Sequence, residues 1–283
     1  MTITEKSYSV PASAPATEPW SDRLRRMPDA VWFVISGTVA IAAFQAMIWL
    51  DILPSKYFPS VAEIGATLVE LAGTTRLWAA LGDTLISAGI GLLIAIVLAT
   101  VVGVVAGMYE LVYRSIRVVV EFLRPIPSVA LVPLVVLAYG TGRASALFLV
   151  AFACFWPLLV HTIYGIRDID PVVRDTARVF RISWYRSFFR VTVPSAAPYI
   201  LTGIRISVSI AMILAITAEI VIGMPGLGRQ ITLAQQNGAL AEMYAFIMVT
   251  GIVGYGINRT IMYLEKRTLS WHESQRPRSG GAA

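Results

Sequence analysis

The segment PVVRDTARVFRISWYRSFFRVTVP, residues 171–194, carries five arginines within a chain that is 57% hydrophobic. Only 14% of the 283 residues are charged, whereas a soluble domain is usually about 25% charged. A chain this apolar is typical of a membrane protein. The net charge of +6 does not indicate nucleic-acid binding, because the arginines stand between apolar runs and not on one soluble domain.

Apolar runs on both sides of this segment predict an all-α membrane protein with six transmembrane helices. Residues 1–29 are expected to form a polar N-terminal tail and residues 266–283 a polar, basic C-terminal tail. Between them, residues 30–265 form the transmembrane domain. The first apolar run lacks the short core and small-residue cleavage site of a secretory signal, so we expect it to remain as a membrane helix. The six spans are expected at about 30–50, 84–109, 115–139, 144–166, 195–222 and 242–263, with the basic loop at 167–194.

The third span is interrupted by prolines, at Pro125, Pro127 and Pro133. Proline removes a helical hydrogen bond and kinks or breaks a helix, so the span is expected to break there. Broken backbone at membrane depth must be buried in protein or face water. The break is therefore either a packing kink or an element that lines a path.

In the second span, Gly103 and Gly107 form a small-xxx-small pair that allows close helix approach.

The distribution of Lys and Arg predicts the topology. With six spans, 18 of the 23 basic residues fall on one side and four on the other, and the last, Arg205, lies within the fifth span. Cytoplasmic loops carry an excess of Lys and Arg. Both termini and the 167–194 loop are therefore predicted to be cytoplasmic.

The loop itself has helix signals. Asp170 can cap a first helix and Pro171 suits its first position. Ser183 can cap a second helix, which Pro194 is expected to end as it opens the fifth span. Such a loop could be merely solvated, lie on anionic lipid, or dock onto a cytoplasmic partner, and we favour docking. The first helix is amphipathic, with Val173, Ala177 and Phe180 on one face and Arg174, Arg178 and Arg181 on the adjacent face.

The run DTARVFR at 175–181, followed by V-x-V-P at 191–194, resembles the EAA loop of ABC-importer permeases. Thr176 replaces the first Ala of that motif, and Arg181 stands where the family usually has Gly, so the turn must use ordinary or strained backbone angles. The resemblance covers about residues 55–265. Three further segments, at 57–68, 122–142 and 218–231, are similar to the nitrate, sulfonate and taurine branch.

The resemblance implies a type I ABC importer permease fold in the bacterial inner membrane. Its partners would be a second permease copy in a homodimer, two cytoplasmic ATPase subunits, an external solute-binding protein and the lipid bilayer. The chain contains no P-loop run, so it is expected to be a transport subunit and not an enzyme. ATP and Mg would be used by the ATPase, and no cofactor is expected on this chain. The ATPase-coupling residues would be Arg174, Asp175, Ala177, Arg178, Phe180, Arg181 and Pro194.

Ionisable residues within spans are functional candidates. Arg205 could attract an anionic solute or bond to carbonyls or to a carboxylate on a neighbouring helix. Glu219 could latch an outer gate or sit in a wet interface. The path or gate candidates are Arg205, Glu219, Pro127 and Met212, although packing alone accounts for Met212.

Two remaining patterns concern local pairs and metals. Glu121 and Arg124 are spaced for a local ion pair beside the proline break. His161 and His272 lie far apart in the sequence, so no metal site is expected.

Two other classes of protein remain as alternatives. A secondary transporter or channel would show inverted halves or a charged relay, and an anchor protein would hold a partner without transport. An enzyme has least support. The solute suggested by the branch is a small anion or organic acid such as nitrate, a sulfonate or taurine, and related permeases also move bicarbonate and pyrimidine precursors.

Overall fold

The computed structural model describes residues 29–268, apart from the side chains of residues 29, 30, 33, 174, 178, 266 and 268, and all regular structure in this range is helical. The two tails expected at 1–29 and 266–283 lie almost wholly outside the described residues. The chain divides into a first unit, Met1–Val61, and a second unit, Ala62–Ala283.

The described part of the first unit is one helix, α2 (Asp29–Trp49), and the turn that follows it. Gln45 ties this turn down, because its Oε1 accepts a hydrogen bond from the Val61 backbone N–H at 2.9 Å. Phe44 and Phe58 add an edge-to-face ring contact. The apolar part of α2, Val34–Trp49, is shorter than a membrane-crossing helix needs. The first predicted span is thus a helix, but a short one.

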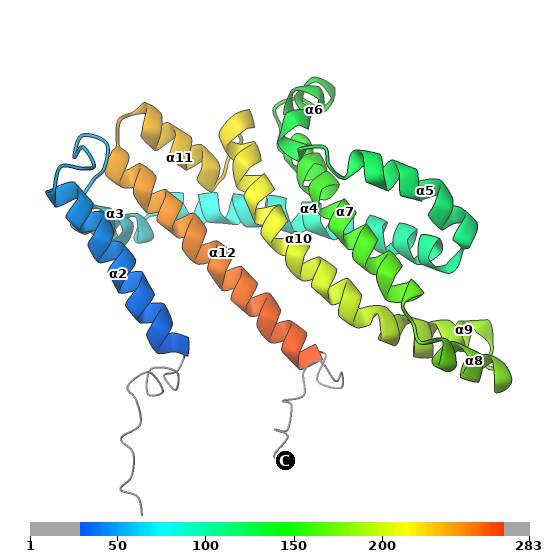
Figure 1. Cartoon of the computed structure of the whole chain (residues 1–283). Coiled ribbons are helices and arrows are strands. Elements are labelled where there is room, and N and C mark those ends of the chain that lie inside the picture. Colours follow the sequence, from blue (N-terminus) through cyan, green and yellow to red (C-terminus); the bar gives the residue numbers. More distant parts are fainter. Residues whose placement is uncertain (1–28, 269–283) are drawn as a thin grey trace, which may run out of the picture. The chain divides into compact units, whose positions relative to one another are not determined.

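Four helical segments of the second unit are long and apolar enough to cross a membrane (Figure 1). They are α4 (Thr75–Met108), α7 (Arg143–Arg167), the continuous run Trp184–Ile222, and α12 (Leu240–Thr268). The run Trp184–Ile222 consists of α9 (Trp184–Ser187), η2 (Phe188–Thr192) and α10 (Val193–Ile222). Shorter helices precede or connect the four segments: α3 (Val61–Ala72), α5 (Glu110–Leu123), η1 (Ser128–Leu131), α6 (Val132–Tyr139), α8 (Pro171–Val179) and α11 (Leu227–Gln236).

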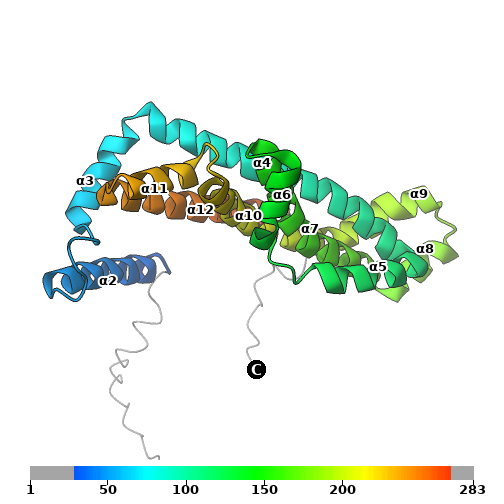
Figure 2. The ribbon, with the colours of Figure 1, turned by 90° about the horizontal axis from the view of Figure 1, so that it is seen from above.

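The core of the second unit is the packing of α4 against α7 and of α7 against α10 (Figure 2). Glycines on α4 permit this close approach. A Cβ at Gly103 would lie 2.7 Å from Thr162 Cβ, and one at Gly107 would lie 2.8 Å from Ile166 Cβ. Helices in lipid associate through such close van der Waals packing, because lipid tails provide no hydrophobic drive. The predicted small-xxx-small contact is confirmed, with α7 as its partner.

The predicted break in the third span is also confirmed. Helix α5 ends at Leu123, and after Arg124–Pro127 the chain continues through η1 and α6 at 85° to α5. Pro127 has an extended backbone and starts the 3-10 turn. Taken together, the bent pair can count as a fifth span.

Pro194 does not separate two helices, contrary to the sequence prediction. The helix runs unbroken from Trp184 to Ile222, and the wider π-helical turn η2 precedes the proline. The Val193 N–H bonds to Phe188 O, five residues back. A π turn changes the local hydrogen-bond register, which lets the helix pass a residue that lacks an N–H. The second loop helix, α9, is therefore the start of the continuous helical run that ends with α10.

Candidate functional site

The basic loop at 167–194 begins as the sequence predicts. Asp170 Oδ1 accepts a hydrogen bond from the Val172 N–H at 2.8 Å, and Pro171 is the first residue of α8. This satisfies one of the backbone donors that a helix start leaves open. Ser183 precedes α9 as predicted, but its side chain makes no capping bond.

Helix α8 ends in a Schellman turn. The Ile182 N–H donates to Ala177 O at 3.0 Å, which is the long bond of this turn. The Phe180 N–H makes the last regular helical bond, to Thr176 O, also at 3.0 Å. Such a turn needs a left-handed residue just beyond the helix, usually Gly. Here Arg181 occupies that position with φ 48°. The sequence left open whether this turn uses ordinary or strained backbone angles. The structure has the strained angles, because Arg181 adopts the left-handed geometry for which glycine is favoured.

The prediction that Ala177 and Phe180 share one open face is wrong. Ala177 is 6% exposed and Phe180 is 74% exposed. The reason is that α8 stops at Val179, so Phe180 lies on the turn and leaves the face on which Ala177 packs. Val173 remains partly open at 42%.

The loop nevertheless presents an apolar knob. We use this name for four exposed side chains around the turn: Val179, Phe180, Trp184 and Tyr185. An exposed apolar cluster of this kind suits contact with a protein partner or with lipid. Asp175 and Pro194 are exposed as well. The side chains of Arg174 and Arg178 lie outside the described structure.

Beside the knob is a basic hollow of about 580 Å³. Arg181, Arg186 and Arg190 contribute its positive charge. A partner that fills it would have to supply negative charge next to an apolar pocket for the knob.

At the other end of α10, Glu219 lies in a fully buried polar cluster. Its Oε2 accepts hydrogen bonds from Thr84 Oγ1 at 3.0 Å and from the Gly228 N–H at 2.8 Å. Thr84 Oγ1 in turn accepts from the Leu227 N–H at 2.9 Å. Glu219 and Thr84 are both 0% exposed. The interpretation of Glu219 as a residue of a wet interface is wrong, since this carboxyl is sealed inside the chain.

Two glycines make this cluster possible. Gly226 has φ +150°, and a Cβ there would lie 2.1 Å from Glu219 Cδ. A Cβ at Gly228 would lie 2.4 Å from Ile216 O. Glycine is therefore required at 226, in the turn before α11, and at 228, in the first turn of α11, for this segment to close over the carboxylate. We call Glu219, Thr84 and this turn the Glu219 clasp.

Sequence reasoning missed Thr84, which pairs with Glu219 across 135 residues. The only signal was a hydroxyl at the start of the second predicted span. Ion pairs surround the same end of the molecule: Arg76 Nη1 lies 2.5 Å from Glu242 Oε1, and Arg143 Nη2 lies 2.6 Å from Asp83 Oδ1. They join α4 to α12 and to α7.

The other path candidates have intrachain neighbours. Arg205 Nη1 lies 3.6 Å from Glu265 Oε2 on α12, which matches the alternative of a carboxylate on a neighbouring helix. Met212 is 6% exposed and packs in the α4–α7–α10 core. Pro127 is exposed at the break. Within residues 29–268, no three His, Cys, Asp or Glu side chains gather in a way that could hold a metal.

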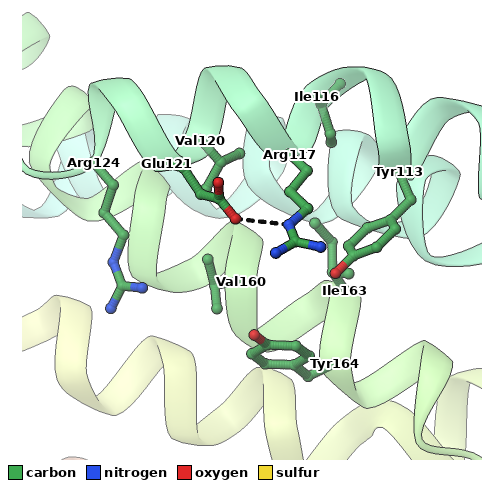
Figure 3. A pocket seen from close by; sticks show the side chains of 9 residues that line it. All are labelled: Tyr113, Ile116, Arg117, Val120, Glu121, Arg124, Val160, Ile163 and Tyr164. Carbon is green, nitrogen blue, oxygen red and sulfur yellow. Dashed lines mark hydrogen bonds and ion pairs between the residues drawn. The ribbon is translucent and has the colours of Figure 1, made fainter.

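The predicted ion pair of Glu121 with Arg124 is wrong. Glu121 Oε1 instead accepts from Arg117 Nε at 2.6 Å, one helical turn earlier (Figure 3). Arg117, Glu121 and Arg124 line a cavity of about 280 Å³ between α5 and α7. Sequence spacing could not choose between the two arginines, because both are within reach of Glu121 on a helix.

An all-helical unit with several apolar spans, a broken span and an exposed apolar knob beside a basic hollow is typical of a multi-pass membrane protein. The chain belongs to the family described as binding-protein-dependent transport system inner membrane component, whose model matches residues 95–267. The predicted resemblance to ABC transporter permeases is confirmed.

Named relatives agree with the family. The chain is 29% identical over 236 residues to a putative aliphatic sulfonates transport permease of Bacillus subtilis, covering 83% of this chain and 86% of the relative. It is 33% identical to a bicarbonate transport permease and 30% identical to a nitrate import permease, both of Synechocystis. These matches cover 58% and 62% of this chain, and 59% and 64% of the two relatives.

Solved structures show the same fold. An inward-facing form of the MetNI methionine ABC transporter aligns with a TM-score of 0.54 at 18% identity, over 72% of this chain and 95% of that one. An amino acid ABC transporter aligns with a TM-score of 0.58 at 16% identity, over 71% and 96%.

Proposed function

We propose that this chain is the transmembrane subunit of an ABC importer that carries a small anion across the bacterial inner membrane. The observation that carries the proposal is the apolar knob at the tip of the basic loop, in a chain that belongs to a binding-protein-dependent transport family. Two copies would form the path as a homodimer. An external binding protein would deliver the solute, and two cytoplasmic ATPases, which use ATP and Mg, would each receive one knob. This chain itself would hold no cofactor.

The topology in this proposal has six spans, with α2 as the first and the bent pair as the third. Both termini and the coupling loop lie in the cytoplasm, as the distribution of basic residues indicates. The coupling residues implied by the family resemblance belong to this proposal, with Phe180 in the knob and Arg181 in the hollow. Ala177 would support the shape of the loop without contacting the ATPase itself, since it is buried.

The continuous helix from Trp184 to Ile222 suggests how the loop acts on the path. Trp184 and Tyr185 belong both to the knob and to the first turn of this helix. A movement imposed on the knob by ATPase closure would therefore be transmitted along a rigid rod to Arg205 and to the Glu219 clasp. A helix of this kind can couple two sites only if it has two arrangements, one for each state of the ATPase.

The solute class rests on the relatives. The names of three of them specify sulfonates, bicarbonate and nitrate, and all of these are small oxyanions. The chain's positive charge, +6 overall, is compatible with anion transport but does not choose among these solutes.

The test is purification of the chain from its native membrane in mild detergent, with identification of the proteins that remain bound. We expect a P-loop ATPase with the native chain and with Phe180→Leu, which keeps the knob apolar. Phe180→Asp should lose the ATPase, because burying an unpaired carboxylate in an apolar cleft is costly.

Uptake of nitrate, bicarbonate and methanesulfonate by the reconstituted complex then tests import. Uptake that needs ATP supports the importer. Uptake driven by an ion gradient, without any ATPase, would favour the secondary transporter instead.

A further inference from the structure

Helix α5 has three distinct faces. Val112, Ile116 and Val120 pack against the core, whereas Leu111, Val118 and Phe122 are 79%, 70% and 75% exposed. The third face carries only charged side chains, at spacings of three and four that keep them within one arc of the helix: Glu110, Arg114, Arg117, Glu121 and Arg124. An apolar exposed face suits lipid, whereas the charged face, whose three arginines count among the basic residues of the predicted cytoplasmic side, must meet water or protein.

The charged face borders the cavity between α5 and α7 (Figure 3). Tyr113, Arg117 and Arg124 extend from α5 toward α7, and Tyr164 lies there on α7. The volume of about 280 Å³ is ample for a small oxyanion and a few waters, since a water in the liquid occupies about 30 Å³.

The charges of this cavity do not cancel. Arg117 is paired with Glu121 at 2.6 Å. Within residues 29–268, the Arg124 side chain has no hydrogen-bond or ion-pair partner. Two guanidinium groups and one carboxylate leave one net positive charge beside two phenol hydroxyls, which can each donate a hydrogen bond. Guanidinium groups match oxyanions in geometry and are less strongly hydrated than ammonium groups.

Beside Tyr113, which lines the cavity, two further arginines share one carboxylate. Arg167 Nη2 lies 2.6 Å from Glu110 Oε2, and its guanidinium carbon lies 4.0 Å from the centre of the Tyr113 ring. Arg114 pairs with the same Glu110 at 2.7 Å. Glu110 is therefore shared by two arginines, each of which has an ion-pair partner, whereas Arg124 has none among the described residues.

We infer that this cavity is an anion-binding station of the transport path, in which Arg124 binds one oxyanion and Arg117 and Tyr164 assist. The inference rests on the proposed function and names where the solute pauses within the chain. It assigns the proline break a role as a path-lining element, because the break places Arg124 at the end of α5 beside the cavity. Glu121 limits the affinity by holding Arg117, so that the anion can leave again.

Anion binding can be measured without ATPase or binding protein, by the broadening of the chloride-35 NMR line by the full chain in nanodiscs of phosphatidylcholine. We expect broadening that nitrate, bicarbonate or methanesulfonate displaces. Arg124→Gln should weaken anion binding by about tenfold or more, which is the usual effect of losing a charge-assisted hydrogen bond.

Two further variants separate the station from general effects of charge. Arg114→Gln removes the same charge from the same face of α5 but outside the cavity, and it should leave the broadening unchanged. Glu121→Gln should strengthen anion binding several-fold, because it frees Arg117. A gain of binding cannot come from misfolding.

Equal loss in Arg124→Gln and Arg114→Gln, or no change in either, would overturn the station. So would loss of the chloride signal when phosphatidylglycerol replaces part of the phosphatidylcholine, because a lipid headgroup would then be the occupant. If uptake of the anion needs ATP but anion binding does not depend on Arg124, the station is refuted and the proposed importer function stands. If anion binding depends on Arg124 but the complex takes up no anion, the proposed solute class is refuted and the binding site stands.

Discussion

Replacement of Thr84 by Val tests the Glu219 clasp. The change keeps the shape of the side chain but removes the hydroxyl that accepts from the Leu227 N–H and contacts Glu219 Oε2. A buried N–H without a partner costs about 1–3 kcal/mol, and the lost hydrogen bond to the carboxyl adds to it, so we expect a total of about 2–4 kcal/mol. For a chain of this size each kcal/mol lowers Tm by about 2–4 °C, which predicts a fall of about 4–16 °C.

The assay is thermal unfolding of the detergent-solubilised chain, followed by intrinsic fluorescence, with Thr162→Val as the matched control. Thr162 is equally buried, at 0% exposure, but its hydroxyl bonds only to Leu158 O within its own helix. That carbonyl keeps its helical partner, so the control should change Tm by only about 1 °C. Equal falls in the two variants would refute the reasoning, because the loss would then reflect any buried hydroxyl and not the joining of α4, α10 and α11.

Three further predictions concern helix packing and the coupling loop. Gly103→Ala should lower Tm, since overpacking costs about 1–3 kcal/mol. Gly89→Ala, with nothing within 4 Å of its added Cβ, should leave Tm unchanged or raise it. A lower Tm for Gly89→Ala than for Gly103→Ala would contradict the α4–α7 contact. Arg181→Gly should keep the turn and slow hydrogen exchange at Ile182, while Arg181→Val should speed it, because a β-branched residue resists φ 48°. Ala177→Asp should destabilise the loop and speed its cleavage in limited proteolysis. Phe180→Asp should leave the cleavage rate unchanged and lose only the bound ATPase. Equal cleavage rates for the two variants would argue against the burial of Ala177.

Much of the architecture could be predicted from local pattern. The apolar runs indicated helices because their length and lack of charge are properties of consecutive residues. The proline cluster predicted the break after Leu123, and the glycine pair on α4 predicted a close helix contact. Asp170 and Pro171 marked the start of α8 for the same reason, since a helix cap involves only neighbouring residues.

The site was less predictable where a contact depends on which helices pack together. Glu219 was recognised as a candidate, but its partner Thr84 lies 135 residues away, and no spacing rule links the two. The choice of Arg117 over Arg124 as the partner of Glu121 was also open, because helix geometry allows both. That choice matters, since it leaves Arg124 free to bind an anion.

From the sequence alone came the class of the protein, the approximate places of its spans and the start of its basic loop, because composition, hydropathy and motif spacing are properties of the chain itself. The tertiary structure decided the rest. It buried Ala177 and exposed Phe180, since α8 ends between them, and it carried the helix past Pro194 through a π turn. It also enclosed Glu219 beneath two glycines. These outcomes depend on where helices end and which surfaces meet, and such contacts form only when distant parts of the chain are packed together.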